Sequence, residues 1–266
     1  MNILIINTAF DNADYIVVKG YEKENGSLMQ IFSEKADSNA KHSETSLVFV
    51  DNALNEAGLK IGDIDVVAVN LGPGSFTGIR IGVALAKGFL CANENLRAIG
   101  LNSFEPILCR LYEKKNKLNN KCILFDNLEL KRIEELKAKT GNHSYNFDES
   151  KFIDMCESGK NEEKSSESER PLEIYGKVCI PSGKADFYVC EVEGSRINYG
   201  VLSDAEVDER ENCVIFDCDY TVSELVDCVI GKIDAGEFCS ISKLEPIYLK
   251  LSQAEEELKK KQENKD

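Results

Sequence analysis

The residues best suited to chemistry lie in a glycine-rich segment, 72–78, which follows an apolar stretch and precedes a helical pattern. Backbone N–H groups at a helix N-terminus favour a bound anion. The segment is therefore a candidate anion or nucleotide elbow, made of Gly72, Gly74, Ser75, Thr77 and Gly78. The alternative is a tight strand-to-helix turn, in which the glycines bend around Pro73 and Ser75 or Thr77 caps the helix. The glycine spacing matches neither the dinucleotide fingerprint nor the Walker loop.

Other residues with catalytic potential are isolated along the chain. His42 precedes Ser43 and Glu44, but nothing in the sequence assembles a nucleophile with a base and an orienting acid. The ten cysteines contain no Cys-x-x-Cys pair, and two histidines, His42 and His143, offer no zinc-ligand spacing. Cys213 and Cys218 are interpreted as small buried hydrophobic residues. We predict no catalytic residue and no metal ligand in this chain.

Charge and composition exclude some function classes. The formal net charge of −15 makes the chain a poor solitary binder of RNA or DNA, so any nucleic-acid role must be shared with a partner. We expect the cysteines to be reduced thiols of a cytoplasmic protein. The longest apolar run near the start, 3–6, is too short for a secretion signal or a membrane span.

The elements that must position the elbow follow a recognisable order. Three strands are predicted over 3–7, 15–19 and 28–33, joined by turns rich in Asn, Asp and Gly. A helix over 43–57, a strand over 65–71, a helix over 78–91 and a strand over 97–100 follow. An antiparallel meander followed by alternating helices and strands is typical of the ribonuclease H-like fold, which is half of the actin-like (ASKHA) architecture.

The second half of the chain repeats this pattern in reduced form, with strands near 178–180, 187–192, 197–202 and 214–216 and a helix around Leu225, Val229 and Ile233. We therefore predict an α/β, actin-like fold with two related subdomains, the second degenerate. The expected domains are a ribonuclease H-like subdomain at 1–105, a partly disordered insertion at 106–176, the degenerate subdomain and closing segment at 177–252, and a charged tail at 253–266.

The two N-terminal helices are more apolar than a one-sided surface helix requires. The second helix carries only two charged residues, Arg80 and Lys87, and small residues form a ridge along it. Both helices either lie inside one domain or also form a partner-docking surface. The candidate interface residues are Leu47, Phe49, Val50, Leu54, Ile79, Gly82, Val83, Ala86, Phe89 and Leu90.

An actin-like fold also raises the possibility of nucleotide chemistry. Enzymes of this type hold Mg²⁺-nucleotide with an aspartate that ends the first strand and a nearby glycine. Here those positions are Asn7 and Ala9, and Asp11 is assigned to an ordinary turn. A small-molecule kinase or ATPase of the actin-like group is therefore retained only as the alternative function.

Several motifs together resemble the bacterial TsaB (YeaZ) family. They are 42–44 at the start of the first helix, Gly58-Leu59 at its end, 72–82 through the elbow, and 244–250 with 253–255 near the C-terminus. The resemblance covers about the first 105 residues and a short C-terminal stretch.

The resemblance implies a non-catalytic subunit of the machinery that forms N6-threonylcarbamoyladenosine at position 37 of tRNAs reading ANN codons. Its implied partners are a TsaD-like catalytic paralogue, docked through the two N-terminal helices, and a TsaE-like ATPase, with tRNA bound only through the complex. No cofactor is expected on this chain alone, since ATP or threonylcarbamoyl-adenylate is handled by the complex. A homodimer of the isolated chain stays open.

The sequence departs from the family pattern at three places. The family usually has Asp-Thr-Ser after the first strand, whereas residues 7–9 of this chain are Asn-Thr-Ala. The family's usual Asp-Ala-Arg in the second half is replaced by Pro-Ser-Gly at 181–183. The insertion between about Cys109 and Gly176 has no counterpart that we can place. These departures bear on nucleotide contacts and leave the docking helices unchanged.

Overall fold

The computed structural model describes residues 1–22, 29–36, 42–108, 174–182, 186–194, 196–203, 213–215 and 220–250. The chain divides into two compact units, one formed by Met1–Cys109 with Tyr220–Asp266 and the other by Arg110–Asp219. Most of the predicted insertion, from 109 to 173, and the predicted tail at 253–266 lie outside the described residues.

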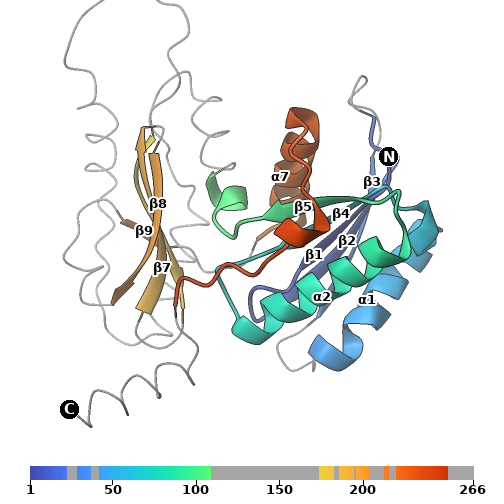
Figure 1. Cartoon of the computed structure of the whole chain (residues 1–266), viewed down its shortest axis with the longest axis horizontal. Helices are drawn as coiled ribbons and strands as arrows, with labels where there is room; N and C mark the ends of the chain where they lie inside the picture. The colour runs from blue at the N-terminus through green and yellow to red at the C-terminus, as the bar shows by residue number, and fades with distance from the viewer. Residues whose placement is uncertain are drawn as a thin grey trace, which may run out of the picture. The chain divides into compact units, whose positions relative to one another are not determined.

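The first unit is built on a five-stranded sheet with the order β3-β2-β1-β4-β5 (Figure 1). Its strands are β1 (Ile3–Asn7), β2 (Ala13–Lys19), β3 (Gln30–Ala36), β4 (Val66–Asn70) and β5 (Arg97–Leu101). β1 to β3 form an antiparallel meander, whereas β4 runs parallel to β1 and β5 runs parallel to β4. The antiparallel meander and the parallel crossovers predicted for a ribonuclease H-like unit are therefore confirmed.

Helices cover both faces of this sheet. α1 (His42–Ala57) and α2 (Phe76–Ala92) lie side by side on one face, and α7 (Val222–Ala235) lies on the other (Figure 1). Every residue of β1 and β4 is buried. Successive side chains of a strand point to opposite faces, so complete burial requires a cover on each side. The apolar run at 3–6 belongs to β1, a central strand that helices cover on both faces.

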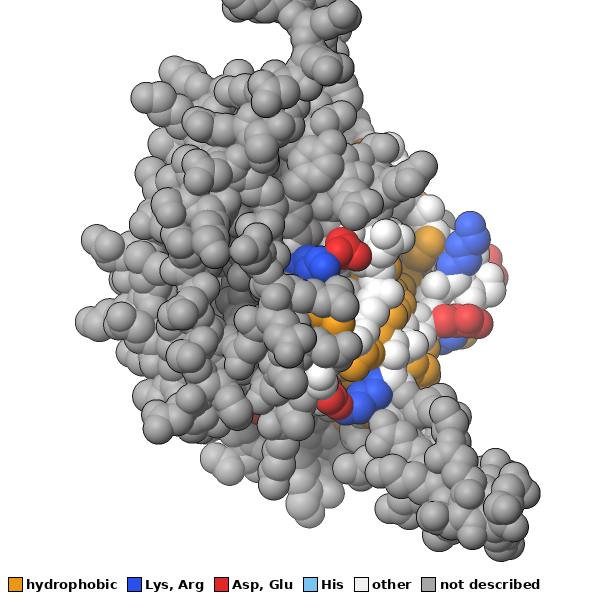
Figure 2. Space-filling model, turned by 90° about the vertical axis from the view of Figure 1, so that its left-hand side faces the viewer, with side chains coloured by type: hydrophobic (Ala, Val, Ile, Leu, Met, Phe, Trp, Pro, Cys, Tyr) orange, Lys and Arg blue, Asp and Glu red, His pale blue; other side chains and the backbone are white. Residues whose placement is uncertain are grey.

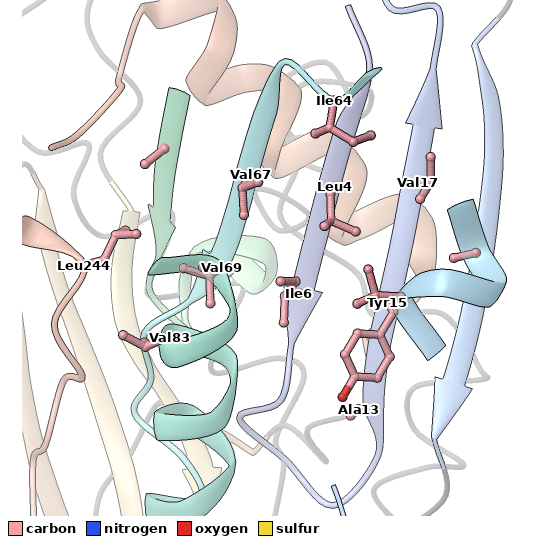
Figure 3. Packing of buried hydrophobic residues seen from close by; sticks show 14 of the residues in the cluster. Leu4, Ile6, Ala13, Tyr15, Val17, Ile64, Val67, Val69, Val83 and Leu244 are labelled. Atoms are coloured by element: carbon pink, nitrogen blue, oxygen red, sulfur yellow. The ribbon is translucent and has the colours of Figure 1, made fainter. Parts of the chain in front are cut away.

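The core between the sheet and α1 and α2 is formed by aliphatic side chains from several elements (Figure 3). Leu4 and Ile6 of β1 and Val83 of α2 are among its buried members. Leu244 also belongs to this core and is fully buried, although it comes from the C-terminal segment that follows α7. Ile247 of the same segment donates its backbone N–H to the carbonyl oxygen of Leu71, at 2.7 Å.

The C-terminal part of the first unit differs from the division expected from the sequence. The expected second subdomain at 177–252 included α7 and the closing segment, whereas the structure groups residues from Tyr220 onward with the N-terminal sheet. The physical reason is that α1 and α2 cover only one face of the N-terminal sheet, so its other apolar face needs a further helix. α7 contacts β2 and β5 there, and buries Leu225, Val226 and Val229.

The second unit contains a four-stranded sheet with the order β8-β7-β6-β9. Its strands are β6 (Ile174–Pro181), β7 (Asp186–Gly194), β8 (Arg196–Ser203) and β9 (Cys213–Ile215). β6 to β8 form an antiparallel meander and β9 runs parallel to β6, which is the arrangement of β1 to β4 in the first unit. The predicted actin-like α/β fold with a reduced second copy is thus confirmed.

Candidate elbow and partner-docking surface

The elbow predicted at 72–78 joins the end of β4 to the start of α2. Gly72 adopts φ +102°, a conformation that L side chains rarely adopt, and its peptide bond to Pro73 is cis. The Ser75 hydroxyl accepts the backbone N–H of Gly78 at 3.2 Å, so Ser75 is the N-cap of α2. Thr77, the other predicted cap, is exposed in the first turn.

The remaining elbow glycines allow a close approach by the loop after β1. A Cβ atom at Gly74 would lie 2.2 Å from the carbonyl oxygen of Ala9, and one at Gly78 would lie 2.0 Å from that of Thr8. A Cβ at Gly82, one turn further along α2, would lie 2.4 Å from the Thr8 hydroxyl. The small-residue ridge predicted on α2 therefore contacts the chain's own backbone. These contacts explain the glycines without a ligand, and the anion elbow stays a prediction.

A chain of buried polar side chains ties the elbow to the sheet. The amide Nδ2 of Asn7 donates to Asp14 Oδ2 at 3.0 Å, and Asn70 Nδ2 donates to Asn7 Oδ1 at 2.9 Å. Asn70 Oδ1 in turn accepts the Gly72 N–H at 2.9 Å. The Ser103 hydroxyl lies 3.0 Å from Asn70 Oδ1 and 2.7 Å from the Pro73 carbonyl oxygen. Asn7 thus serves as a donor to a carboxylate, a bond that an ionised aspartate could not make.

Of the other candidates with catalytic potential, the structure describes the side chain of Asp11. Asp11 is exposed in the bend between β1 and β2. The side chains of His42, Ser43 and Glu44 at the start of α1 lie outside the described residues, as does His143. Within the described ranges, no group of three His, Cys, Asp or Glu side chains is placed to hold a metal ion.

Most of the candidate interface residues face the chain's own sheet. Six of the ten are buried: Val50, Leu54, Ile79, Gly82, Val83 and Ala86. Their contacts are with the core of the first unit, where a helix over a sheet places its apolar stripe. These six residues therefore support the shape of the two helices and are not open to a partner in this structure.

The other four candidates keep part of their surface accessible. Leu47 on α1 is 60% exposed, and its neighbour Val48, which was not among the candidates, is 56% exposed. Phe49, Phe89 and Leu90 are half-buried against the core, and Phe49 stacks on Tyr15 with ring centroids 5.8 Å apart. The accessible apolar surface of these helices lies at the first turns of α1 and along the outer side of α2.

One cluster beside α2 joins residues that are distant in the sequence. The Arg80 guanidinium lies over the Phe76 ring, 3.7 Å from its centroid, and its Nε donates to the Tyr248 hydroxyl at 2.7 Å. The Phe76 and Tyr248 rings are 5.0 Å apart and are 38% and 43% exposed. No local sequence pattern predicts this cluster, because 168 residues separate Arg80 from Tyr248.

Apolar side chains also reach the surface on the face drawn in Figure 2. There the described residues present a band of hydrophobic atoms bordered by Lys, Arg, Asp and Glu side chains. Apolar atoms are thus not confined to the interior of the units. In the part of the chain that is described, no helix combines the length and hydrophobicity needed to cross a bilayer.

Comparisons with known proteins match part of the chain in sequence. The family model of the tRNA N6-adenosine threonylcarbamoyltransferase TsaD matches residues 31–126. A tRNA N6-adenosine threonylcarbamoyltransferase of Cereibacter sphaeroides is 48% identical over 61 residues, which are 23% of this chain and 16% of that protein. The TsaB protein of Escherichia coli, a tRNA threonylcarbamoyladenosine biosynthesis protein, is 38% identical over 63 residues, 24% of this chain and 27% of that protein. The matches thus span between a sixth and about a quarter of these relatives.

Solved structures match over nearly the whole chain. YeaZ from Pseudomonas aeruginosa superposes with a TM-score of 0.55 at 15% identity, over 93% of this chain and 99% of that one. A second structure, described as an uncharacterized protein with similarity to peptidase YeaZ from Pseudomonas aeruginosa, gives 0.56 at 14% identity over 94% and 99%. The resemblance predicted from the motifs is therefore confirmed: the chain resembles the TsaB (YeaZ) family, in fold over nearly its whole length and in sequence over about a quarter of it.

Proposed function

We propose that this chain is a TsaB-like scaffold subunit of the complex that forms N6-threonylcarbamoyladenosine at position 37 of tRNAs reading ANN codons. In this proposal the chain docks a TsaD-like catalytic paralogue through the accessible sides of α1 and α2 and stabilises its active conformation. A TsaE-like ATPase joins the assembly, tRNA binds only through the complex, and the complex handles ATP or threonylcarbamoyl-adenylate. The compartment is the cytoplasm.

The observation that carries the proposal is the exposure of adjacent aliphatic side chains on α1. Leu47 and Val48 are both more than half exposed, although neither is needed to cap or turn the helix. Large exposed apolar side chains next to a polar surface are typical of protein-interaction sites. α1 also lies within residues 31–126, which the TsaD family model matches, and a paralogous pair would place its shared contact surface in such a segment.

A non-catalytic role agrees with the chemistry of the elbow. Asn7 donates to Asp14 within a buried network, and Gly74 and Gly78 are in contact with the loop after β1. A kinase or ATPase of the actin-like group, the alternative function, needs an acidic metal ligand near this point. ATP turnover by the purified chain that is lost in Asp11→Ala would favour the alternative.

Binding to the paralogue tests the proposal directly. The full-length chain is titrated by calorimetry into a TsaD-like protein from the same source, alongside Val48→Glu. We expect Val48→Glu to weaken binding by roughly tenfold or more, because it places a charge in an apolar contact.

The matched control is Ile31→Glu. Ile31 on β3 is 43% exposed and pairs with Val18 of β2. The next residue, Phe32, packs against the core on the α1 side of the sheet, so Ile31 lies on the opposite face. Ile31→Glu therefore places the same charge on an exposed aliphatic residue that is not on the α1 face. Wild-type affinity in Val48→Glu, or equal losses in both variants, would contradict docking through α1.

A further inference from the structure

The Phe76, Arg80 and Tyr248 cluster holds a cation rigidly at the surface. The Arg80 guanidinium is stacked on one ring, 3.7 Å from the Phe76 centroid, and lies 5.5 Å from the centroid of the other. The Nε bond to Tyr248 fixes the rotation of the guanidinium plane as well as its position. Arg80 itself is exposed, so the fixed cation faces outward.

The hydrogen bond to Tyr248 determines which edge of Arg80 is left for a ligand. A guanidinium carries five N–H donors, one on Nε and four on the two Nη atoms. Nε is used by Tyr248, and among the described residues no carboxylate forms an ion pair with the Nη atoms. The end-on fork of Nη1 and Nη2 is therefore left for a ligand. This fork matches the two oxygens of a carboxylate.

The charge of α2 contrasts with the charge of the chain. α2 contains two cations, Arg80 and Lys87, and no acidic residue, whereas the whole chain has a formal net charge of −15. α1 carries three acidic residues, Glu44, Asp51 and Glu56, and no Lys or Arg. The outer side of α2 is thus a local positive strip, and it complements a partner surface of negative charge.

We propose that Phe76, Arg80 and Tyr248 form a preassembled anchor that receives an Asp or Glu side chain of the protein partner. This inference rests on the proposed function and names the chemistry of its contact. The two aromatic rings bury against the stem of the acidic side chain, and the Nη fork binds its carboxylate at two points. Because the arginine is already held in place, little side-chain freedom is lost on binding. Arginine and tyrosine are also enriched among the residues that dominate interface energies.

An exposed arginine beside aromatic rings could also bind RNA, through phosphates and stacked bases. The formal charge of −15 opposes a densely charged polymer, because phosphate binding depends on many cations acting together. A single carboxylate set in a protein surface carries one charge and brings apolar contacts with it. The observations therefore favour a protein side chain.

Affinity measurements with matched variants test the anchor. The whole 266-residue chain is titrated by calorimetry into the TsaD-like paralogue as wild type, Arg80→Gln, Arg80→Lys, Tyr248→Phe and Lys87→Gln. Arg80→Gln is expected to weaken binding roughly 10- to 100-fold, and Arg80→Lys nearly as much, because lysine keeps the charge and loses the fork. Tyr248→Phe keeps the ring and should lose about threefold. Lys87→Gln removes the same charge from the same helix and should change affinity by less than about threefold.

The outcomes separate the anchor from the proposed function. If the wild-type chain does not bind the paralogue, the proposed function fails and the anchor fails with it. If the wild type binds and Arg80→Gln binds equally well, only the anchor is overturned. Equal losses in Arg80→Gln and Lys87→Gln would also overturn it, since they indicate general electrostatic attraction. If the isolated chain binds labelled tRNA and Arg80→Gln abolishes that binding, the cluster is an RNA-binding site and the proposal that it receives a carboxylate is overturned.

Discussion

Replacing Gly78 by alanine tests whether the elbow glycines serve internal packing. A Cβ at this position would lie 2.0 Å from the Thr8 carbonyl oxygen, a distance that real Cβ atoms do not reach. The clash is with backbone, so no side-chain rotation relieves it. The start of α2 or the loop after β1 must move by about 1.4 Å, because ordinary contact begins at 3.4 Å and the Cβ would lie at 2.0 Å.

The cost of this shift follows from what it disturbs. Overpacking of a tight contact costs about 1–3 kcal/mol. The shift also strains the Thr8 hydroxyl bond to the Gly78 carbonyl at 2.7 Å and the Ser75 N–H bond to the Ala9 carbonyl at 2.6 Å, each worth about 0.5–1.5 kcal/mol. Alanine gains about 1 kcal/mol in helix propensity over glycine. We therefore expect Gly78→Ala to destabilise the first unit by about 2–4 kcal/mol.

Gly88 in the same helix supplies the matched control. A Cβ there would meet nothing within 4 Å, so Gly88→Ala should stabilise by about 0.5–1 kcal/mol. Urea unfolding followed by far-UV circular dichroism measures both variants, because the chain has no tryptophan. Gly78→Ala with the stability of Gly88→Ala would refute the packing argument and return the elbow to a ligand-binding interpretation.

Three further predictions concern the network, the cap and a buried tyrosine. Asn7→Asp places a second carboxylate against Asp14 and should lower the free energy of unfolding by roughly 1–3 kcal/mol at pH 7. The loss should be smaller near pH 4, where the two carboxylates share a proton, and urea midpoints at both pH values measure it. Ser75→Ala should cost about 1 kcal/mol and Ser75→Gly only a few tenths, and equal losses would contradict the cap. Burial and the Asp234 carboxylate raise the pKa of Tyr21 from its ordinary value of 10.0 to about 12. The stability of the wild type should therefore fall as the pH rises from 10 to 12, whereas Tyr21→Phe should lack that fall in a pH series of urea midpoints.

The elements of the fold were predictable because each has a strong local pattern. The near-continuous apolar strands and the capped, amphipathic α7 place their boundaries within a few residues of those observed. The partner of α7 was not predictable from its position in the chain. The signal that could have located it is the apolar run of β1, which requires a cover on both faces of the sheet and therefore a helix beyond α1 and α2.

The candidate surface was only partly predictable for a related reason. When a helix is apolar nearly all round, its sequence does not show which side packs against its own sheet. The predicted interface therefore includes the buried Val50, Ile79 and Ala86 together with the accessible Leu47. The contact between Arg80 and Tyr248 forms because the C-terminal segment packs beside α2, and no local sequence pattern in either segment predicts that packing. Asn70 gave a weak signal, since a polar residue ending an apolar strand must find a buried partner.

Reconstitution of the modification tests the central claim most directly. The TsaD-like paralogue, the TsaE-like ATPase, threonylcarbamoyl-adenylate and an unmodified tRNA reading ANN codons are combined with this chain, without it, or with Val48→Glu, and N6-threonylcarbamoyladenosine is quantified by mass spectrometry. A scaffold role predicts modification only with the wild-type chain and a severe loss with Val48→Glu. Equal modification in the absence of the chain would contradict the account.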